Sequence, residues 1–159
     1  MKQNKKGFTL IELLAVIVIL AIIALIATPI VLNMINSAKK SAAKSSALGF
    51  VDSIEYYAGF HQASTSDLTL AGYETPLPTM DTTTKKATCT LAENGSWTGS
   101  AGCEAFMAAV EGKSKGKGPK TASIELDSAG KVQSGSTLTY DGGVCTYENN
   151  DCTMDKKSE

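Results

Sequence analysis

The sequence predicts an α+β protein in which a long amino-terminal α-helix, transmembrane in its first half, packs on a small antiparallel β-sheet head. Two observations support this fold class. Leu13–Ala27 is uninterrupted apolar sequence, and its apolar flanks extend it to the length that a membrane helix needs. After residue 86, short runs of alternating apolar and polar residues are separated by Gly, Asn and Asp, a pattern typical of strands joined by tight turns.

We expect one helix over residues 8–58, about 75 Å long at 1.5 Å per residue. Pro29 lies inside it and removes a backbone donor, which predicts a kink there. Beyond Pro29 the apolar positions change sides: one face carries Val31, Ile35, Ala38 and Ala42, and a face roughly opposite carries Ala47, Val51, Ile54 and Ala58. The first face is expected to meet other molecules or lipid, and the second to meet the protein's own head.

One acid stands inside the apolar segment. Glu12 follows the lysines Lys2, Lys5 and Lys6 by a few residues, and a charged side chain at mid-bilayer costs on the order of 2 kcal/mol or more. A cleaved secretory signal peptide is disfavoured because no small-x-small site precedes Pro29. A plain membrane anchor explains the length of the segment but does not explain the presence of Glu12 in it.

The amino terminus has a recognisable order: a short lysine-rich leader over residues 1–6, then Gly7, Phe8, Thr9, Leu10, Ile11 and Glu12, then the apolar run with Pro29. Over residues 1 to about 57 the chain resembles a type IV prepilin, with the class III signal that type IV pilins share with the pseudopilins of secretion and competence machines. The resemblance implies that a membrane prepilin peptidase cuts after Gly7 and that Phe8 becomes N-methylated. Beyond residue 57 the likeness is only general, to pilin heads from low-GC Gram-positive bacteria.

The resemblance implies a division into a leader at residues 1–7, a helix at 8–58 and a globular head at 59–159. It implies a structural subunit, not an enzyme, that leaves the cytoplasmic membrane to form a helical homo-oligomeric filament on the cell surface with the help of an assembly platform and an ATPase. In that filament, Glu12 would pair with the amino terminus of a neighbouring subunit. Adhesion, twitching motility and DNA uptake are the outputs implied. The alternatives are a pseudopilin and a monomeric membrane-anchored binding domain.

Within the head, residues 59–86 lack periodicity and predict a surface connection. His61 in this segment is predicted to be a solvated helix-end residue rather than a ligand or a base. Asn94-Gly95 is a preferred hairpin pair. Strands are predicted at 87–92, 96–98, 123–127, 131–140, 144–148 and 152–154, the last four as an antiparallel meander, with a short helix at 104–111.

Four cysteines, Cys89, Cys103, Cys145 and Cys152, follow the membrane segment, where an exported domain is oxidised. Of the three possible pairings we favour the two that close short loops, Cys89 with Cys103 and Cys145 with Cys152. A final turn centred on residues 148 and 149 would place the second pair directly opposite each other. A zinc site is disfavoured because no C-x₂-C spacing occurs.

Charge and motifs limit the chemistry. Fifteen lysines, no arginine and sixteen acids leave a net charge of −1, so no large basic field for nucleic acid is expected. A lysine cluster among glycines remains a candidate contact for DNA or a host surface, at Lys113, Lys115, Lys117 and Lys120. An oxygen-rich calcium site is the weaker interpretation of a set of turn residues, Asp141, Asn149, Asn150, Asp151 and Asp155. No catalytic motif or cofactor is predicted.

Overall fold

The computed structural model describes residues 8–63, 72–114 and 116–155. Within these residues two helices and six strands follow one another as α1 Leu10–Ala63, β1 Ala87–Leu91, β2 Trp97–Gly99, α2 Cys103–Lys113, β3 Thr121–Leu126, β4 Thr137–Tyr140, β5 Gly143–Glu148 and β6 Asp151–Asp155. The strands form one antiparallel sheet in the order β2-β1-β3-β4-β5-β6. This confirms the predicted α+β class and matches the type IV pilin fold. The chain divides into two compact units, residues 1–38 and 39–159.

In the first unit, α1 is apolar on every side. Each Leu, Ile, Val and Met between Leu10 and Ile35 is exposed, with exposed fractions of 44% or more, and the helix is long and apolar enough to cross a membrane. The helix continues through Pro29. One residue before it, the Thr28 hydroxyl donates to the Ala24 carbonyl at 2.7 Å. The kink at Pro29 stays a prediction.

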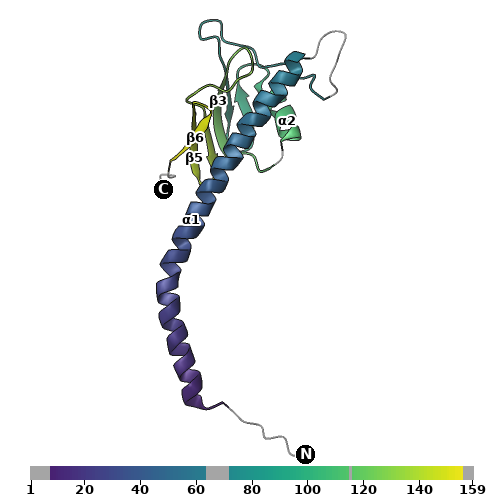
Figure 1. The fold of residues 1–159 in the computed structure, drawn as a ribbon. Coiled ribbons are helices and arrows are strands. Elements are labelled where there is room, and N and C mark those ends of the chain that lie inside the picture. Colours follow the sequence, from purple (N-terminus) through teal and green to yellow (C-terminus); the bar gives the residue numbers. More distant parts are fainter. Residues whose placement is uncertain (1–7, 64–71, 115, 156–159) are drawn as a thin grey trace, which may run out of the picture. The chain divides into compact units, whose positions relative to one another are not determined.

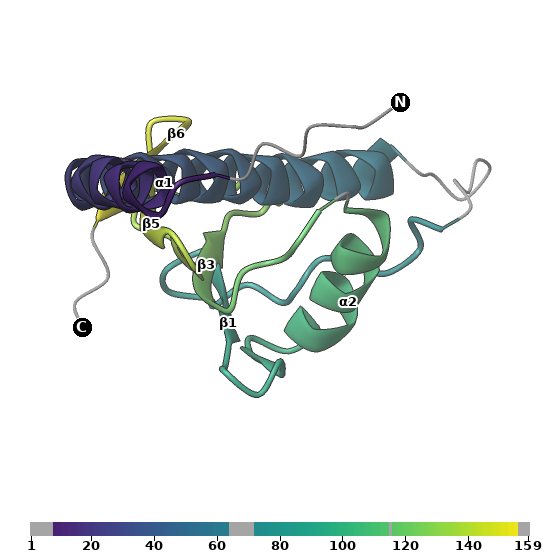
Figure 2. The same cartoon turned by 90° about the horizontal axis from the view of Figure 1, so that it is seen from below.

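In the second unit, α1 lies along the sheet (Figures 1 and 2). One helical face is buried against the head, consisting of Ala43, Ala47, Phe50, Val51, Ile54, Tyr57 and Ala58. These include the four residues predicted to face the head, so that prediction is confirmed. The helix ends at Ala63, five residues beyond the predicted 58, because Tyr57 and Ala58 are still in the core and Phe60 stacks with Tyr73 at 4.9 Å between ring centroids.

Two glycines let the sheet connections approach α1 closely. A Cβ atom on Gly142, in the turn between β4 and β5, would lie 2.3 Å from the Lys39 carbonyl oxygen and 2.9 Å from Ala43 Cβ. A Cβ atom on Gly130 would lie 2.2 Å from Ala58 Cβ, and its φ of +72° also favours glycine. Because glycine has no side chain, the sheet connections can contact α1 closely near both ends of its buried face.

The first hairpin and α2 close one end of the core. Asn94-Gly95 lies in the loop between β1 and β2, where Gly95 has a φ of +82°, so the predicted hairpin is confirmed. Trp97 stacks with Phe50 at 6.3 Å and donates its ring N–H to Glu111 of α2 at 2.9 Å. The predicted helix 104–111 is also confirmed, since α2 buries Phe106, Met107 and Val110.

The last four strands form the predicted meander, but its final turn is shifted by one residue. Glu148 pairs with Asp151, so the turn is centred on Asn149 and Asn150, which have φ values of +50° and +62°. Positive φ at both central positions is the geometry of a type I′ hairpin turn, which Asn tolerates better than Glu does. Our prediction of a turn at 148 and 149 was wrong for this reason.

The predicted strand 131–140 is also shorter than expected, since β4 begins at Thr137. The preceding residues form a loop that is held by side chains. The Asp127 carboxylate accepts from the backbone N–H groups of Ala129 and Lys131, at 2.9 Å each. The buried Ser136 hydroxyl accepts from the Glu125 N–H at 3.0 Å and donates to the Gln133 carbonyl at 2.8 Å. These bonds replace ladder hydrogen bonds, which is the common behaviour of Asp and Ser near turns.

The close packing of α1 against the turn at Gly142 predicts opposite effects on stability for two glycine substitutions. Gly142→Ala should destabilise the head by about 1–3 kcal/mol because its new methyl group meets helix backbone. Gly49→Ala should stabilise it by roughly 0.5–1 kcal/mol, because nothing lies within 4 Å of that position and alanine favours helix. Urea unfolding of the detergent-solubilised chain, followed by Trp97 fluorescence, measures both effects. Equal stabilities of the two variants would contradict the close contact between Gly142 and α1.

Candidate functional site

The amino terminus of α1 is capped by its own side chains. Thr9 precedes the first helical residue, and its backbone N–H donates to Glu12 Oε2 at 2.9 Å. The Thr9 hydroxyl donates to the same oxygen at 2.8 Å. A Glu three residues after the N-cap that accepts its backbone N–H is one half of a capping box. The sequence analysis missed this role of Glu12, although the Thr-x-x-Glu spacing was there to find.

The surroundings of this cap are apolar. Leu10, Ile11 and Leu13 are exposed by 84%, 74% and 61%. Within the part of the chain that the structure describes, Glu12 makes no ion pair. Its carboxylate is therefore hydrogen-bonded on one oxygen and has no positive partner among the described residues. A charge of this kind, in an apolar setting, is costly unless a positive partner arrives.

The predicted processing residues lie just before this cap. Phe8 precedes the helix and is 87% exposed. Gly7, the predicted cleavage position, lies outside the described residues. Because Thr9 and Glu12 both follow Gly7, removal of a leader at that point would leave the cap intact.

The amino-terminal segment matches a known family model. Residues 2–28 match a family model described as the prokaryotic N-terminal methylation motif. The segment is a prepilin signal. Comparison with the curated proteins and with the solved structures gave no match. The prepilin signal supports a type IV pilin-like or pseudopilin protein. It points to a structural protein rather than to an enzyme, and together with the apolar helix it supports anchoring in the membrane. A Gram-positive type stays a prediction.

The cysteines of the head form two disulfides, and no free cysteine occurs among the described residues. Cys89 of β1 is bonded to Cys103 at the start of α2, and Cys145 of β5 is bonded to Cys152 of β6. This is the pairing that short loops favour. Because the final turn is shifted, Cys145 lies opposite Met154 and Cys152 opposite Tyr147. The second bond therefore joins diagonal neighbours, and the predicted direct opposition was wrong.

The lysine cluster is largely occupied by contacts within the head. Lys117 and Lys120 both pair with Asp141, and the Lys113 ammonium lies 5.1 Å from the centre of the Tyr73 ring. Lys115 lies outside the described residues. One carboxylate offsets part of the positive charge of these lysines, which weakens the attraction that the cluster would have for DNA.

The calcium interpretation does not fit the geometry. Asp151 and Asp155 lie at opposite ends of the β5–β6 pairing, since they face Glu148 and Val144. Asp151 pairs with Lys44 at 2.8 Å, and Asn150 accepts from the Tyr147 hydroxyl at 3.2 Å. Within the described ranges no group of three or more His, Cys, Asp or Glu side chains is arranged to hold a metal. These residues are turn and strand-end residues.

His61 lies at the end of a helix, as predicted, but it is less exposed to solvent than expected. It is half-buried in the last turn of α1, and its Nδ1 lies 2.9 Å from the Tyr73 carbonyl oxygen. The prediction of a solvated residue was wrong because the helix runs past 58 and residue 73 returns beside it.

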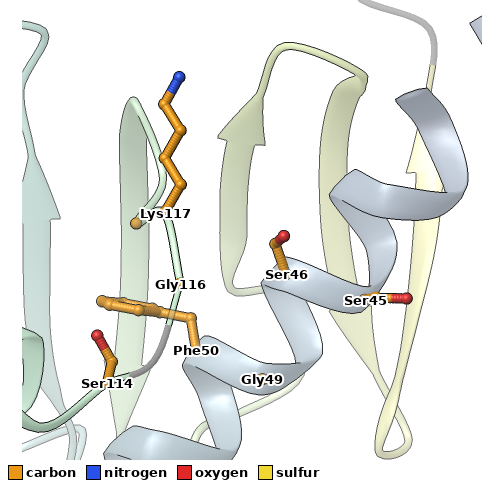
Figure 3. Close-up of a pocket in the computed structure, with 8 residues that line it drawn as sticks. Ser45, Ser46, Gly49, Phe50, Ser114, Gly116 and Lys117 are labelled. Carbon is orange, nitrogen blue, oxygen red and sulfur yellow. The ribbon is translucent and has the colours of Figure 1, made fainter.

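A small pocket lies between α1 and the loop before β3 (Figure 3). Its volume is about 210 Å³, and its described lining is Ser45, Ser46, Gly49, Phe50, Ser114, Gly116, Lys117 and Gly118. Figure 3 shows the Lys117 side chain extending away from the helix, and its ammonium pairs with Asp141 instead. The described lining residues of the pocket bring together neither an acid–base pair nor an activated nucleophile.

The surface ion pairs of the head predict an acid-sensitive stability. Hydrogen bonds from Lys120 and Lys117 hold the pKa of Asp141 below its ordinary value of 3.8. A hydrogen bond from Lys44, then one from the Cys152 N–H, does the same for the pKa of Asp151. A folded-state pKa below the unfolded one adds stability above pH 3.8, and that stability is lost as the pH falls through the folded pKa.

We expect the free energy of unfolding to decrease below about pH 3.8, and to decrease less in the Asp141→Asn/Asp151→Asn variant. Both carboxylates are exposed, so the difference should be modest and should shrink in high salt. Urea unfolding at about pH 6 and about pH 3, followed by Trp97 fluorescence, measures it. An identical acid response in the variant would show that other carboxylates carry the effect.

Proposed function

We propose that this chain is a structural subunit of a type IV pilus, cut by prepilin peptidase after Gly7, N-methylated on Phe8 and polymerised into a surface filament. One observation carries the proposal: inside a prepilin signal, the Glu12 carboxylate has hydrogen bonds from Thr9 but no positive partner among the described residues. The proposal divides the chain into the leader 1–7, the helix that begins at Phe8, and the head.

Cleavage would supply the missing partner. Cutting the Gly7–Phe8 peptide bond creates a new amino group, and N-methylation keeps that group positive. In a filament the amino group of one subunit would pair with Glu12 of its neighbour. A buried ion pair roughly breaks even in energy but penalises every arrangement in which one charge is left alone. Such a pair would therefore fix the axial register of the subunits more than it would add stability.

The apolar half of α1 would supply the adhesion between subunits. Side chains that are exposed in the single chain, from Leu10 to Ile35, would exchange lipid for the helices of other subunits. The small size of Ala15, Ala21 and Ala24 would allow helices to approach closely. The assembly platform and its ATPase would extract the subunit, and the cell surface would be its final place. Adhesion, motility and DNA uptake are all compatible with such a filament.

Intact-mass and amino-terminal analysis of the protein taken from its own cells tests the processing step. We expect a chain that begins at N-methylated Phe8, recovered in sheared surface filaments, with all four thiols oxidised. A chain that still begins at Met1 would refute processing. A processed chain found only in the membrane would instead favour a pseudopilin, since pseudopilins carry the same signal.

Three substitutions separate the two roles of Glu12. Glu12→Gln keeps an oxygen that can accept the Thr9 N–H but removes the charge, whereas Glu12→Ala removes both. Thr9→Val removes the hydroxyl bond and keeps the charge. We expect both Glu12 variants to yield at least about tenfold fewer filaments, because an unmatched amino terminus costs several kcal/mol, and Thr9→Val to assemble.

Filament yield is measured by shearing and electron microscopy, and cell fractionation shows that each variant still reaches the membrane. Wild-type filament yield from Glu12→Gln would reduce Glu12 to a helix cap and would overturn the proposed pairing.

A further inference from the structure

A row of hydroxyl side chains crosses the whole sheet on the face away from α1. In each strand the residues facing α1 are buried, and the alternate residues are exposed or half-buried. Directly opposed residues connect one strand to the next without a break. In strand order they are Thr98, Thr90, Ser123, Thr137, Thr146 and Thr153, and we call them the hydroxyl row.

The row is accessible and largely unused. Thr98 donates weakly to the Thr90 carbonyl at 3.4 Å. The other five hydroxyls have no hydrogen bond within the described part of the chain. Elsewhere in the head, by contrast, the hydroxyls of Ser100 and Ser136 satisfy backbone groups. Each free hydroxyl offers one donor and two acceptor positions to a ligand.

The surroundings of the row are rich in hydroxyl groups, and the charges without an ion pair among the described strand residues of this face are acidic. Thr88, Thr121 and Thr139 lie on the same face beside it. Glu125 is paired with Lys86 at 2.7 Å and Asp151 with Lys44 at 2.8 Å, which leaves Glu148 and Asp155 as acids without an ion pair on this face of the described strands. The aromatic strand residues Trp97, Tyr140 and Tyr147 are buried on the other face. β-Branched residues suit strands, but exposed sheets usually also carry Lys and Glu, which are missing from this row.

These features select the chemistry of the partner. A face whose unpaired charges on the described strands are acidic, and whose Lys86 is paired with Glu125, does not attract nucleic acid or anionic polymers. A face without aromatic or large apolar side chains lacks the core of a protein interface. Neighbouring strands lie 4.7–4.9 Å apart, so the row is roughly 24 Å long. Since adjacent strands are rotated by about 20–25°, a rigid flat surface cannot follow the row, whereas a flexible linear chain can.

We propose that the hydroxyl row binds a neutral polysaccharide chain, which lies across the strands and exchanges hydrogen bonds with successive hydroxyls. The proposal goes beyond filament assembly, because the row lies wholly within one head and functions in a single chain. In a filament the row would be repeated from subunit to subunit, and weak binding at each copy would add up to avidity.

Affinity electrophoresis of the full chain tests this proposal. The protein is kept in a polyoxyethylene detergent, because a maltoside would itself present sugars, and is run in native gels that contain dextran, galactomannan or xyloglucan. Heparin gels and DNA gels serve as the charged comparison. The row variant is Ser123→Ala/Thr137→Val/Thr146→Val, which removes three hydroxyls and keeps the β-branched shape at two of the positions. The matched control is Thr88→Val/Thr121→Val/Thr139→Val, which removes three hydroxyls beside the row.

We expect at least one neutral polysaccharide to retard the wild type. The dissociation constant should rise at least about tenfold in the row variant and less than about threefold in the control. Retardation of the wild type by none of the neutral polymers, retardation only by heparin or DNA, or equal losses in the two variants would each overturn the proposal. Trp97 fluorescence reports that each variant is folded. If the row variant unfolds, Thr137→Lys, which blocks the centre of the row with one exposed substitution, gives the same test.

Discussion

The central constraint on this molecule is that α1 is longer than the surface its own head can cover. The helix has 54 residues, and its buried positions begin only at Ala43. Every large apolar side chain from Leu10 to Ile35 is left exposed in the single chain. Apolar surface of this extent is unstable in water, so the amino-terminal half needs lipid or other helices around it. Membrane residence and self-assembly are two answers to that one requirement.

Glu12 bears on both environments of this helix, the membrane and the assembly with other helices. At the start of the helix it accepts two hydrogen bonds from Thr9, so it serves the local structure of a single chain at little cost. In the proposed filament a charged Glu12 would make an all-apolar assembly unfavourable until an amino terminus came beside it. Such a residue would suit a subunit that assembles only after processing.

The two faces of the sheet in the head have different surroundings. The inner face, with Ile124, Leu126 and Leu138, packs on α1 and α2, and Gly142 and Gly130 allow the helix to lie close. The outer face takes no part in that packing, and most of its strand residues are Thr or Ser, with a minority of acids. Because successive strand residues point to opposite faces, a slip of one residue in any strand would exchange core for surface. The two disulfides and the Asn149-Asn150 turn help to fix this register.

The sequence by itself determined the features that depend on local patterns: the apolar helix, the helix face with Ala47 and Val51 that packs on the head, the Asn94-Gly95 hairpin, α2 and the meander. Each follows from periodicity or from the φ preference of a turn residue. Tertiary structure decided what depends on register and on distant contacts. The final turn lies at Asn149-Asn150 because both residues must adopt positive φ, and β4 is short because Ser136 and Asp127 take over ladder bonds. The helix extends to Ala63 because aromatic residues on both sides of residues 64–71 pack together. The hydroxyl row was invisible in the sequence, since its six residues are scattered from 90 to 153 and only strand pairing aligns them.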